Sequence, residues 1–214
     1  MMTRRQVPAD ELHDRKSPRE VESHTHVWQG RVFGLDEDLV RVVDGQEPVV
    51  RQYLAHPGAV GIVALRGEEG AEQVLLERQY RHPVGAELWE VPAGLLDVAG
   101  EEPWAAARRE LREEADLEAA RWDVLVDYFT SPGGSSESIR VYLARDVRPT
   151  ATPFPREDEE ADMLETWVDL DEAVSGVLAG RFHNPTTVVG ILATATARSR
   201  GWQSLRPLDA PWLR

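Results

Sequence analysis

The helix expected at residues 104–115 constrains the fold of this chain more than any other feature. The segment is rich in Ala, Leu, Glu and Arg, which favour helix, and Pro103 suits its first turn. On a helical wheel, the apolar side chains share one side and three carboxylates share another. The apolar set is Trp104, Ala107, Leu111 and Ala115, and the acidic set is Glu110, Glu113 and Glu114. The chain must therefore bury one side of this helix and supply positive charge near the other.

Short runs of β-type residues lie before and after this helix. They cover residues 59–65, 73–80, 87–91, 122–129, 139–144 and 165–168. Two further helices are expected. One covers residues 171–178 and ends before Gly180, and the other begins with Asn184 as N-cap and Pro185 in the first position. We therefore predict an α/β (α+β) fold with mixed β-sheets sandwiched between helices.

The chain is expected to divide into three parts. Residues 1–24 show little apolar periodicity and are predicted to form a flexible tail. Residues 25–55 contain short alternating runs around Asp44-Gly45, a pair typical of two-residue hairpins, and are predicted to form an N-terminal antiparallel β extension. Residues 56–208 are predicted to form the main domain.

The composition argues against several classes of protein. The chain has no cysteine, which excludes disulfides, thiolate ligands and a cysteine nucleophile, so that any metal would be bound by oxygen or imidazole. A net charge of -14 disfavours nucleic acid and anionic membranes as partners. The apolar stretches are too short to span a bilayer, and the first residues lack a signal-peptide pattern. We expect a cytoplasmic protein with a small-molecule partner.

The three carboxylates of the helix must repel one another. Glu110 lies three residues before Glu113 and four before Glu114, so the three are neighbours on the helix surface. Arg109 lies four residues before Glu113 and can pair with it, but one arginine cannot neutralise three carboxylates. A divalent cation could bridge Glu110 and Glu114. The alternative is a solvated acidic face on a protein that is acidic throughout.

Residues upstream of the helix favour the cation. Gly94, Glu101 and the run from Arg109 to Leu117 resemble the Nudix box, G-x5-E-x7-R-E-U-x-E-E-x-G-U, where U is aliphatic. Two positions depart from it. One extra residue separates Gly94 from Glu101, in a loop where length costs little. Asp116 replaces the second glycine, which usually supplies a left-handed conformation that Asp tolerates better than most residues.

The resemblance implies a Nudix fold and a Mg²⁺-dependent hydrolase that cuts a pyrophosphate. Two or more Mg²⁺ ions, with Mn²⁺ as the alternative, would neutralise the phosphoryl charge and deliver an in-line water. It assigns Glu110, Glu114 and the Ala93 carbonyl to the metal site. It assigns Glu113 as a ligand or as the partner of one, and Arg109 as the residue that orients these carboxylates.

The chain is most similar to the actinobacterial ADP-ribose pyrophosphatases within that family. Pro132 lies sixteen residues after Asp116, a spacing that marks these enzymes, although a proline there also fits an ordinary turn. Further similarity lies in residues 79–82, 88–100 and 159–163. The expected substrate is therefore ADP-ribose or a related nucleotide sugar, which would be cut to AMP and ribose 5-phosphate.

The same resemblance suggests which residues contact the substrate. Arg81 would bind a phosphate, Glu90 would help to position the substrate, and Glu137 would contact the terminal ribose. Pro132 would belong to the same substrate site. Each residue also has a structural alternative: Arg81 can pair with a surface acid, Glu90 can face solvent on an edge strand, and Glu137 can cap a turn.

An acidic run at residues 157–160 lies in a proline-flanked loop, where such runs are usually solvated. The resemblance instead suggests Glu160 as an additional metal ligand or as the general base that activates water. Glu159 takes this role if the loop register is shifted by one residue. A mobile loop suits a base that closes on bound substrate.

Assembly and substrate class leave alternatives open. In this family the N-terminal strands commonly exchange across a two-fold axis, so we expect a homodimer formed through residues 25–55. Trp28, Trp89 and Trp104 are candidates for stacking on adenine, although tryptophans at such spacing are more often in the core. The alternative functions are hydrolysis of another nucleotide sugar or oxidised nucleotide, or binding of ADP-ribose without catalysis.

Overall fold

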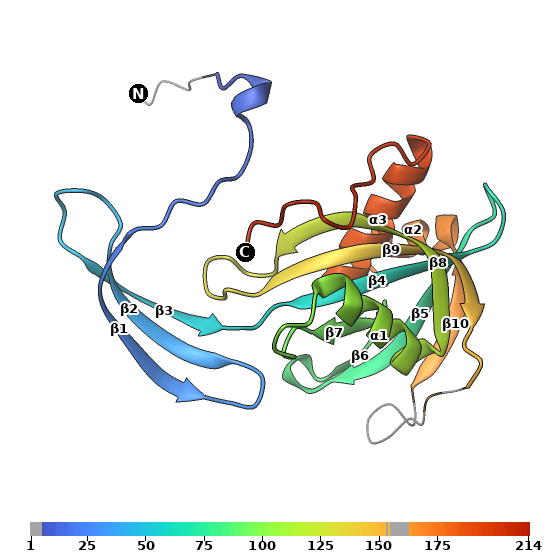
Figure 1. Ribbon diagram of the computed structural model, residues 1–214, viewed down its shortest axis with the longest axis horizontal. Coiled ribbons are helices and arrows are strands. Elements are labelled where there is room, and N and C mark those ends of the chain that lie inside the picture. Colours follow the sequence, from blue (N-terminus) through green and yellow to red (C-terminus); the bar gives the residue numbers. More distant parts are fainter. Residues whose placement is uncertain (1–5, 153, 155–162) are drawn as a thin grey trace.

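The computed structural model describes residues 6–152, 154 and 163–214. A three-stranded sheet stands apart from a larger sheet that is flanked by helices (Figure 1). The prediction of mixed sheets sandwiched between helices, with an N-terminal antiparallel extension, is therefore confirmed. Glu159 and Glu160, the two candidates for the base, lie outside the described residues.

The N-terminal extension is an antiparallel sheet in the order β1-β2-β3. Its strands are β1 (Glu20–Gln29), β2 (Gly34–Arg41) and β3 (Val49–Ala55), and a single 3-10 turn, Ala9–Glu11, precedes them. Residues 20–24, which we assigned to the flexible tail, thus belong to a strand because they pair with the end of β2. The expected two-residue hairpin is wrong as well. Gly45 does turn the chain, at φ +77°, but residues 42–48 all lie between β2 and β3.

The larger sheet runs in the order β10-β5-β4-β9-β8. Its strands are β4 (Ala59–Arg66), β5 (Gln73–Arg81), β6 (Ala86–Glu90), β7 (Ala93–Leu95), β8 (Leu117–Phe129), β9 (Ser138–Pro149) and β10 (Leu164–Asp169), and a short 3-10 turn, His82–Val84, leads into β6. β4 and β9 are parallel, and the other pairs are antiparallel. β7, which pairs with β4, was not predicted, because three residues are too few to show an alternating pattern.

Three helices, α1 (Pro103–Ala115), α2 (Leu170–Leu178) and α3 (Pro185–Ser199), cover this sheet. Pro103 and Pro185 occupy the first turns of α1 and α3, as expected. The side chain of Asn184 caps α3 by accepting from the Thr187 amide at 3.0 Å. Asp169 caps α2 in the same way, since it accepts from the amides of Asp171 and Glu172.

The core lies on both faces of the sheet. Val60 and Ile62 of β4 pack with Leu111 of α1 on one face, and Val63 packs with Ile191 of α3 on the other. A strand buried on both faces must be apolar along its buried length, as β4 is from Ala59 to Leu65. The helix that carries the carboxylates is therefore fixed to the centre of the sheet.

The C-terminal segment returns over β8 and β9. Arg140 of β9 is buried, donates twice to Asp127, and also donates to the carbonyls of Ala210 and Pro211.

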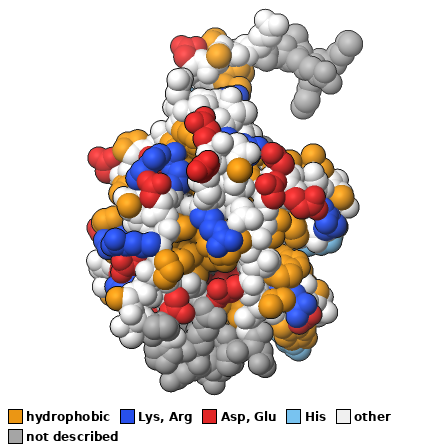
Figure 2. All heavy atoms as spheres, turned by 90° about the vertical axis from the view of Figure 1, so that its right-hand side faces the viewer, with side chains coloured by type: hydrophobic (Ala, Val, Ile, Leu, Met, Phe, Trp, Pro, Cys, Tyr) orange, Lys and Arg blue, Asp and Glu red, His pale blue; other side chains and the backbone are white. Residues whose placement is uncertain are grey.

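Figure 2 shows the face at the right-hand side of Figure 1, where basic and acidic side chains are interspersed. None of the described helices is long and apolar enough to cross a membrane.

Candidate active site

The end of α1 depends on Asp116, the residue that replaces the second box glycine. Asp116 adopts the left-handed conformation, with φ 53° and ψ 33°, as the resemblance required. Its side chain accepts from the amide of Phe154 at 2.6 Å, and its carbonyl accepts from the amide of Thr150 at 2.8 Å. Asp116 therefore ends the helix and also holds the chain that follows β9 beside it.

Arg109 is the centre of a carboxylate cluster. Its Nε and Nη2 donate to the two oxygens of Glu101 at 3.0 Å each, and its Nη1 donates to Glu110 at 2.8 Å and to Glu113 at 3.0 Å. These carboxylates raise the pKa of Arg109, so it stays charged. Sequence spacing predicted only the pairing with Glu113. The contact with Glu101 ties the loop before α1 to the helix.

Glu110 lies in the most confined place of the cluster. Burial raises the pKa of Glu110, although Arg109 beside it favours the charged form. A Cβ on Gly94 would lie 2.1 Å from Cδ of Glu110, so only glycine leaves room for this carboxylate. The first box glycine and the first box glutamate on α1 are thus packed against each other.

Glu114 is held by β7. Its Oε2 accepts from the amide of Ala93 at 2.9 Å. Ala93 was expected to offer its carbonyl to a metal, and in the structure it is the amide of this residue that reaches the box. A carboxylate that accepts a backbone N–H has a defined orientation, so β7 and α1 together position Glu114.

Arg81 and Glu90 form a bidentate ion pair between β5 and β6. Nε of Arg81 donates to Oε1 of Glu90 at 2.9 Å, and Nη2 donates to Oε2 at 2.7 Å. Glu90 is buried, so the alternative that it faces solvent is wrong, whereas Arg81 remains 43% exposed. Glu90 contributes most to the raised pKa of Arg81, and Glu114 and Glu77 also contribute. The pair therefore borders the carboxylate cluster.

Glu77 was missed in the sequence. It is buried on β5, opposite Glu90, and raises the pKa of Arg81. Residues four apart on a strand share a face, so the spacing of Glu77 and Arg81 could have indicated that they lie together. Glu77 is thus a buried acidic side chain beside the Arg81–Glu90 pair.

Glu137 and Pro132 lie elsewhere, in the loop between β8 and β9. Glu137 accepts from Thr130 Oγ1 at 2.7 Å and lies 3.5 Å from Nε2 of His56. Pro132 lines a pocket together with His56. Within the described ranges, no hydrogen bond or ion pair joins either residue to the box carboxylates.

The box residues suit a hard divalent cation. Their donors are carboxylate oxygens, which Mg²⁺ prefers, and a cation would favour the charged form of Glu110 that burial disfavours. The described residues alone contain no group of three or more acidic or histidine side chains arranged around one ion. Glu110 and Glu113 are instead hydrogen-bonded to Arg109. The fit within the described residues therefore rests on Glu110 and Glu114.

The chain was compared with known proteins. Residues 55–186 match the model of the NUDIX domain. An ADP-ribose pyrophosphatase of Mycobacterium tuberculosis is 46% identical over 86% of each chain, and a methanol dehydrogenase activator of Bacillus methanolicus is 34% identical over 77% of this chain and 86% of its own. A crystal structure of an ADP compounds hydrolase has the same fold, with a TM-score of 0.68 and 19% identity over 88% of this chain and 99% of that one. Nudix hydrolases generally use divalent metal ions, and this chain belongs to the Nudix hydrolase family.

Proposed function

We propose that the protein hydrolyses the pyrophosphate of ADP-ribose to AMP and ribose 5-phosphate. The observation that carries the proposal is the Arg109 cluster, in which one guanidinium holds Glu101, Glu110 and Glu113 beside Glu114. This arrangement fixes several carboxylates close together, where they could bind the metal ions of a pyrophosphate substrate. The choice of ADP-ribose is supported by the similarity to the Mycobacterium tuberculosis enzyme.

Glu110 and Glu114 are the proposed ligands of Mg²⁺, with Mn²⁺ as the alternative ion and two or more ions per site. Bound ions supply charge neutralisation at the two phosphoryl groups and an activated water. Glu113 supports the ligands through Arg109, and Ala93 fixes the orientation of Glu114 through its amide. We retain the Ala93 carbonyl as a proposed further ligand.

Arg81 is the proposed phosphate-binding residue. The carboxylate of Glu90 accepts from Nε and Nη2 of the Arg81 guanidinium. In the described part of the chain, no group accepts from Nη1 of Arg81. Nη1 is therefore available for a phosphate oxygen, while Glu90 keeps the guanidinium in one orientation. Glu90 thus acts on the substrate by positioning Arg81.

Glu160 remains the proposed general base, with Glu159 as the substitute. The proposal is supported by the hydrogen bond between Phe154 and Asp116. This bond holds Phe154, which precedes both glutamates in the sequence, at the end of α1. Glu137 and Pro132 are proposed to contact the terminal ribose, from the loop between β8 and β9.

A homodimer formed through the N-terminal sheet is part of the proposal. This sheet exposes apolar side chains that a second copy would cover. The exposed set includes Val21, Val27, Trp28, Val50 and Leu54. We further propose a cytoplasmic location, which the lack of cysteine fits, and no nucleic-acid partner, which the net charge of -14 disfavours.

Turnover of a substrate panel tests the proposal. The protein is incubated with Mg²⁺ and ADP-ribose, NADH, ADP-glucose, GDP-mannose or 8-oxo-dGTP, and AMP or phosphate release is followed. ADP-ribose should give the highest kcat/KM. Tight binding of ADP-ribose without turnover of any compound would instead indicate a binding module.

A matched pair of variants tests the site. Glu114→Gln should lower kcat by at least about a hundredfold, because it removes a charged metal ligand. Glu118→Gln is the control, since Glu118 forms only surface ion pairs with Arg112 and Arg148. Equal rates for both variants would remove Glu114 from the site.

A further inference from the structure

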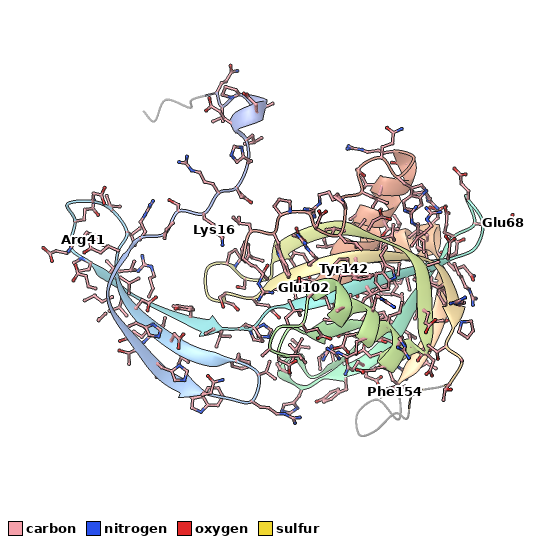
Figure 3. The ribbon with its side chains drawn as sticks, in the orientation of Figure 1. Lys16, Arg41, Glu68, Glu102, Tyr142 and Phe154 are labelled. Atoms are coloured by element: carbon pink, nitrogen blue, oxygen red, sulfur yellow. The ribbon has the colours of Figure 1, made fainter. Side chains whose placement is uncertain are left out.

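The pocket that Pro132 and His56 line contains no residue of the carboxylate helix. Its volume is about 580 Å³, and its walls come from the N-terminal segment, the link between β3 and β4, the loop between β8 and β9, and the last residues described. Figure 3 labels Lys16 on the N-terminal segment, on the side of that loop. Four segments that are apart in sequence therefore meet at one cavity.

The lining of this pocket is basic although the protein is acidic. Arg15, Lys16 and Arg214 line it, and no acidic side chain does. In the part of the chain that the structure describes, no carboxylate pairs with Arg15 or Lys16, and Arg214 donates to the carbonyl of Pro57. On a chain of net charge -14, such a concentration of cations favours an anionic ligand.

His56 adds hydrogen bonding to the pocket. Its Nδ1 accepts from the amide of Gly58 at 3.0 Å, and its Nε2 faces Glu137 at 3.5 Å. The ring therefore links the wall of the pocket to Glu137.

Ser138 places a buried hydroxyl in the same wall. Ser138 is 3% exposed and lines the pocket, and no protein group within the described residues hydrogen-bonds to its Oγ. Buried hydroxyls normally have a partner, because leaving one unmade is costly. This hydroxyl is enclosed by protein, so Ser138 shapes the wall of the pocket and does not itself contact a ligand there.

Apolar side chains also line the pocket. They are Phe129, Pro132 and Leu213, and Ser135 and Ser136 lie in the same lining. A phosphate alone would use the basic side only, whereas a phosphate carried on a flat apolar group would use both. We propose that this pocket, which shares Pro132 with the proposed contact to the terminal ribose, binds a phosphate monoester on an aromatic body, such as a nucleoside monophosphate.

Lys16 allows a site-specific test, because it is the only lysine of the chain. Reductive methylation with ¹³C labels its amine and preserves its charge. Addition of AMP to the full-length protein should shift the Lys16 methyl resonance in a saturable way. The Glu114→Gln variant should show the same shift, which separates this pocket from the proposed catalytic site. The absence of a saturable shift would overturn the proposal.

Variants and related probes refine the test. Arg15→Ala should weaken AMP binding by about tenfold or more, whereas Arg200→Ala, which removes an exposed arginine outside the pocket, should not. Inorganic phosphate should bind at least about tenfold more weakly than AMP, and adenosine should cause no saturable shift. Equal affinity for phosphate and AMP, or loss of binding in Arg200→Ala alone, would contradict the proposed site. Since binding is measured without turnover, failure of the proposed hydrolysis would leave this result unchanged.

Discussion

A Cβ placed on Gly94 would lie 2.1 Å from Cδ of Glu110, well inside van der Waals contact. We predict that Gly94→Ala displaces the Glu110 carboxylate and destabilises the fold by about 1–3 kcal/mol, as overpacking does in well-packed regions. The proposed hydrolysis should fall by at least about tenfold. Thermal unfolding and kcat measure the two effects. Gly133→Ala is the control for stability, because a Cβ there meets nothing within 4 Å, and equal melting temperatures for the two variants would contradict the prediction.

Arg109→Lys tests whether the fork of the guanidinium matters. Lysine keeps the charge but cannot donate to Glu101 with two parallel bonds while it also reaches Glu110 and Glu113. Because Arg109 is 32% exposed, we expect only about 1 kcal/mol of lost stability, but at least about a tenfold lower kcat. Arg112→Lys, on the same helix but with one ion pair at 3.8 Å, should change neither quantity. Identical kinetics for both variants would show that charge alone is sufficient.

Asp116 offers a test of backbone conformation. At φ 53°, an alanine is disfavoured and a glycine is not, so Asp116→Ala should be less stable than Asp116→Gly by about 1 kcal/mol. Both variants lose the side-chain bond to Phe154, so their difference isolates the backbone. Chemical denaturation measures it. If alanine proved as stable as glycine, the left-handed end of α1 would not be strained.

His24 should make the N-terminal sheet sensitive to pH. The hydrogen bond to Asp38, at 2.7 Å, raises the pKa of His24 above its usual 6.5, and the charge of Asp36 adds to this. A raised folded-state pKa gives stability that is fully present below pH 6.5 and is lost as pH rises through the folded value. Across this range, Tm should therefore fall less for His24→Gln than for the wild type.

The histidine resonances provide a direct check of that pKa. His13 lies outside the sheet and bonds only to the carbonyl of Asp10, so His13→Gln should keep the pH dependence of the wild type. If NMR gave His24 a pKa at or below 6.5, Asp38 would not stabilise the protonated imidazole of His24.

Local signals predicted the helices well. Pro103, Asn184 and Pro185 are residues whose geometry favours helix starts, and α1 and α3 begin where they indicate. The Asp44-Gly45 pair located a turn but not its length, since two residues cannot report how the flanking strands pair. β1 begins before the predicted boundary at residue 25, because all of its residues are exposed and no apolar periodicity marks its first residues.

In the site, too, the sequence predicted contacts within one element better than contacts between elements. Spacing along one helix predicted that Arg109 and Glu113 meet. The contacts of Glu101 with Arg109 and of Ala93 with Glu114 join separate elements, and no periodicity within one segment reports them. The burial of Glu90 and Glu77 likewise follows from how β5 and β6 pack in the sheet.

The C-terminal segment has a consequence beyond its contacts with Arg140. β8 is the last strand on its side of the sheet, and the amide and carbonyl of Val124 are paired with those of Arg206. An uncovered outer strand invites pairing with other chains and aggregation. Because the segment is hydrogen-bonded to Val124, it interrupts the outer row of backbone groups on β8 along which another chain could pair. Removing residues 205–214 should therefore lower the solubility of the protein before it affects the chemistry of α1.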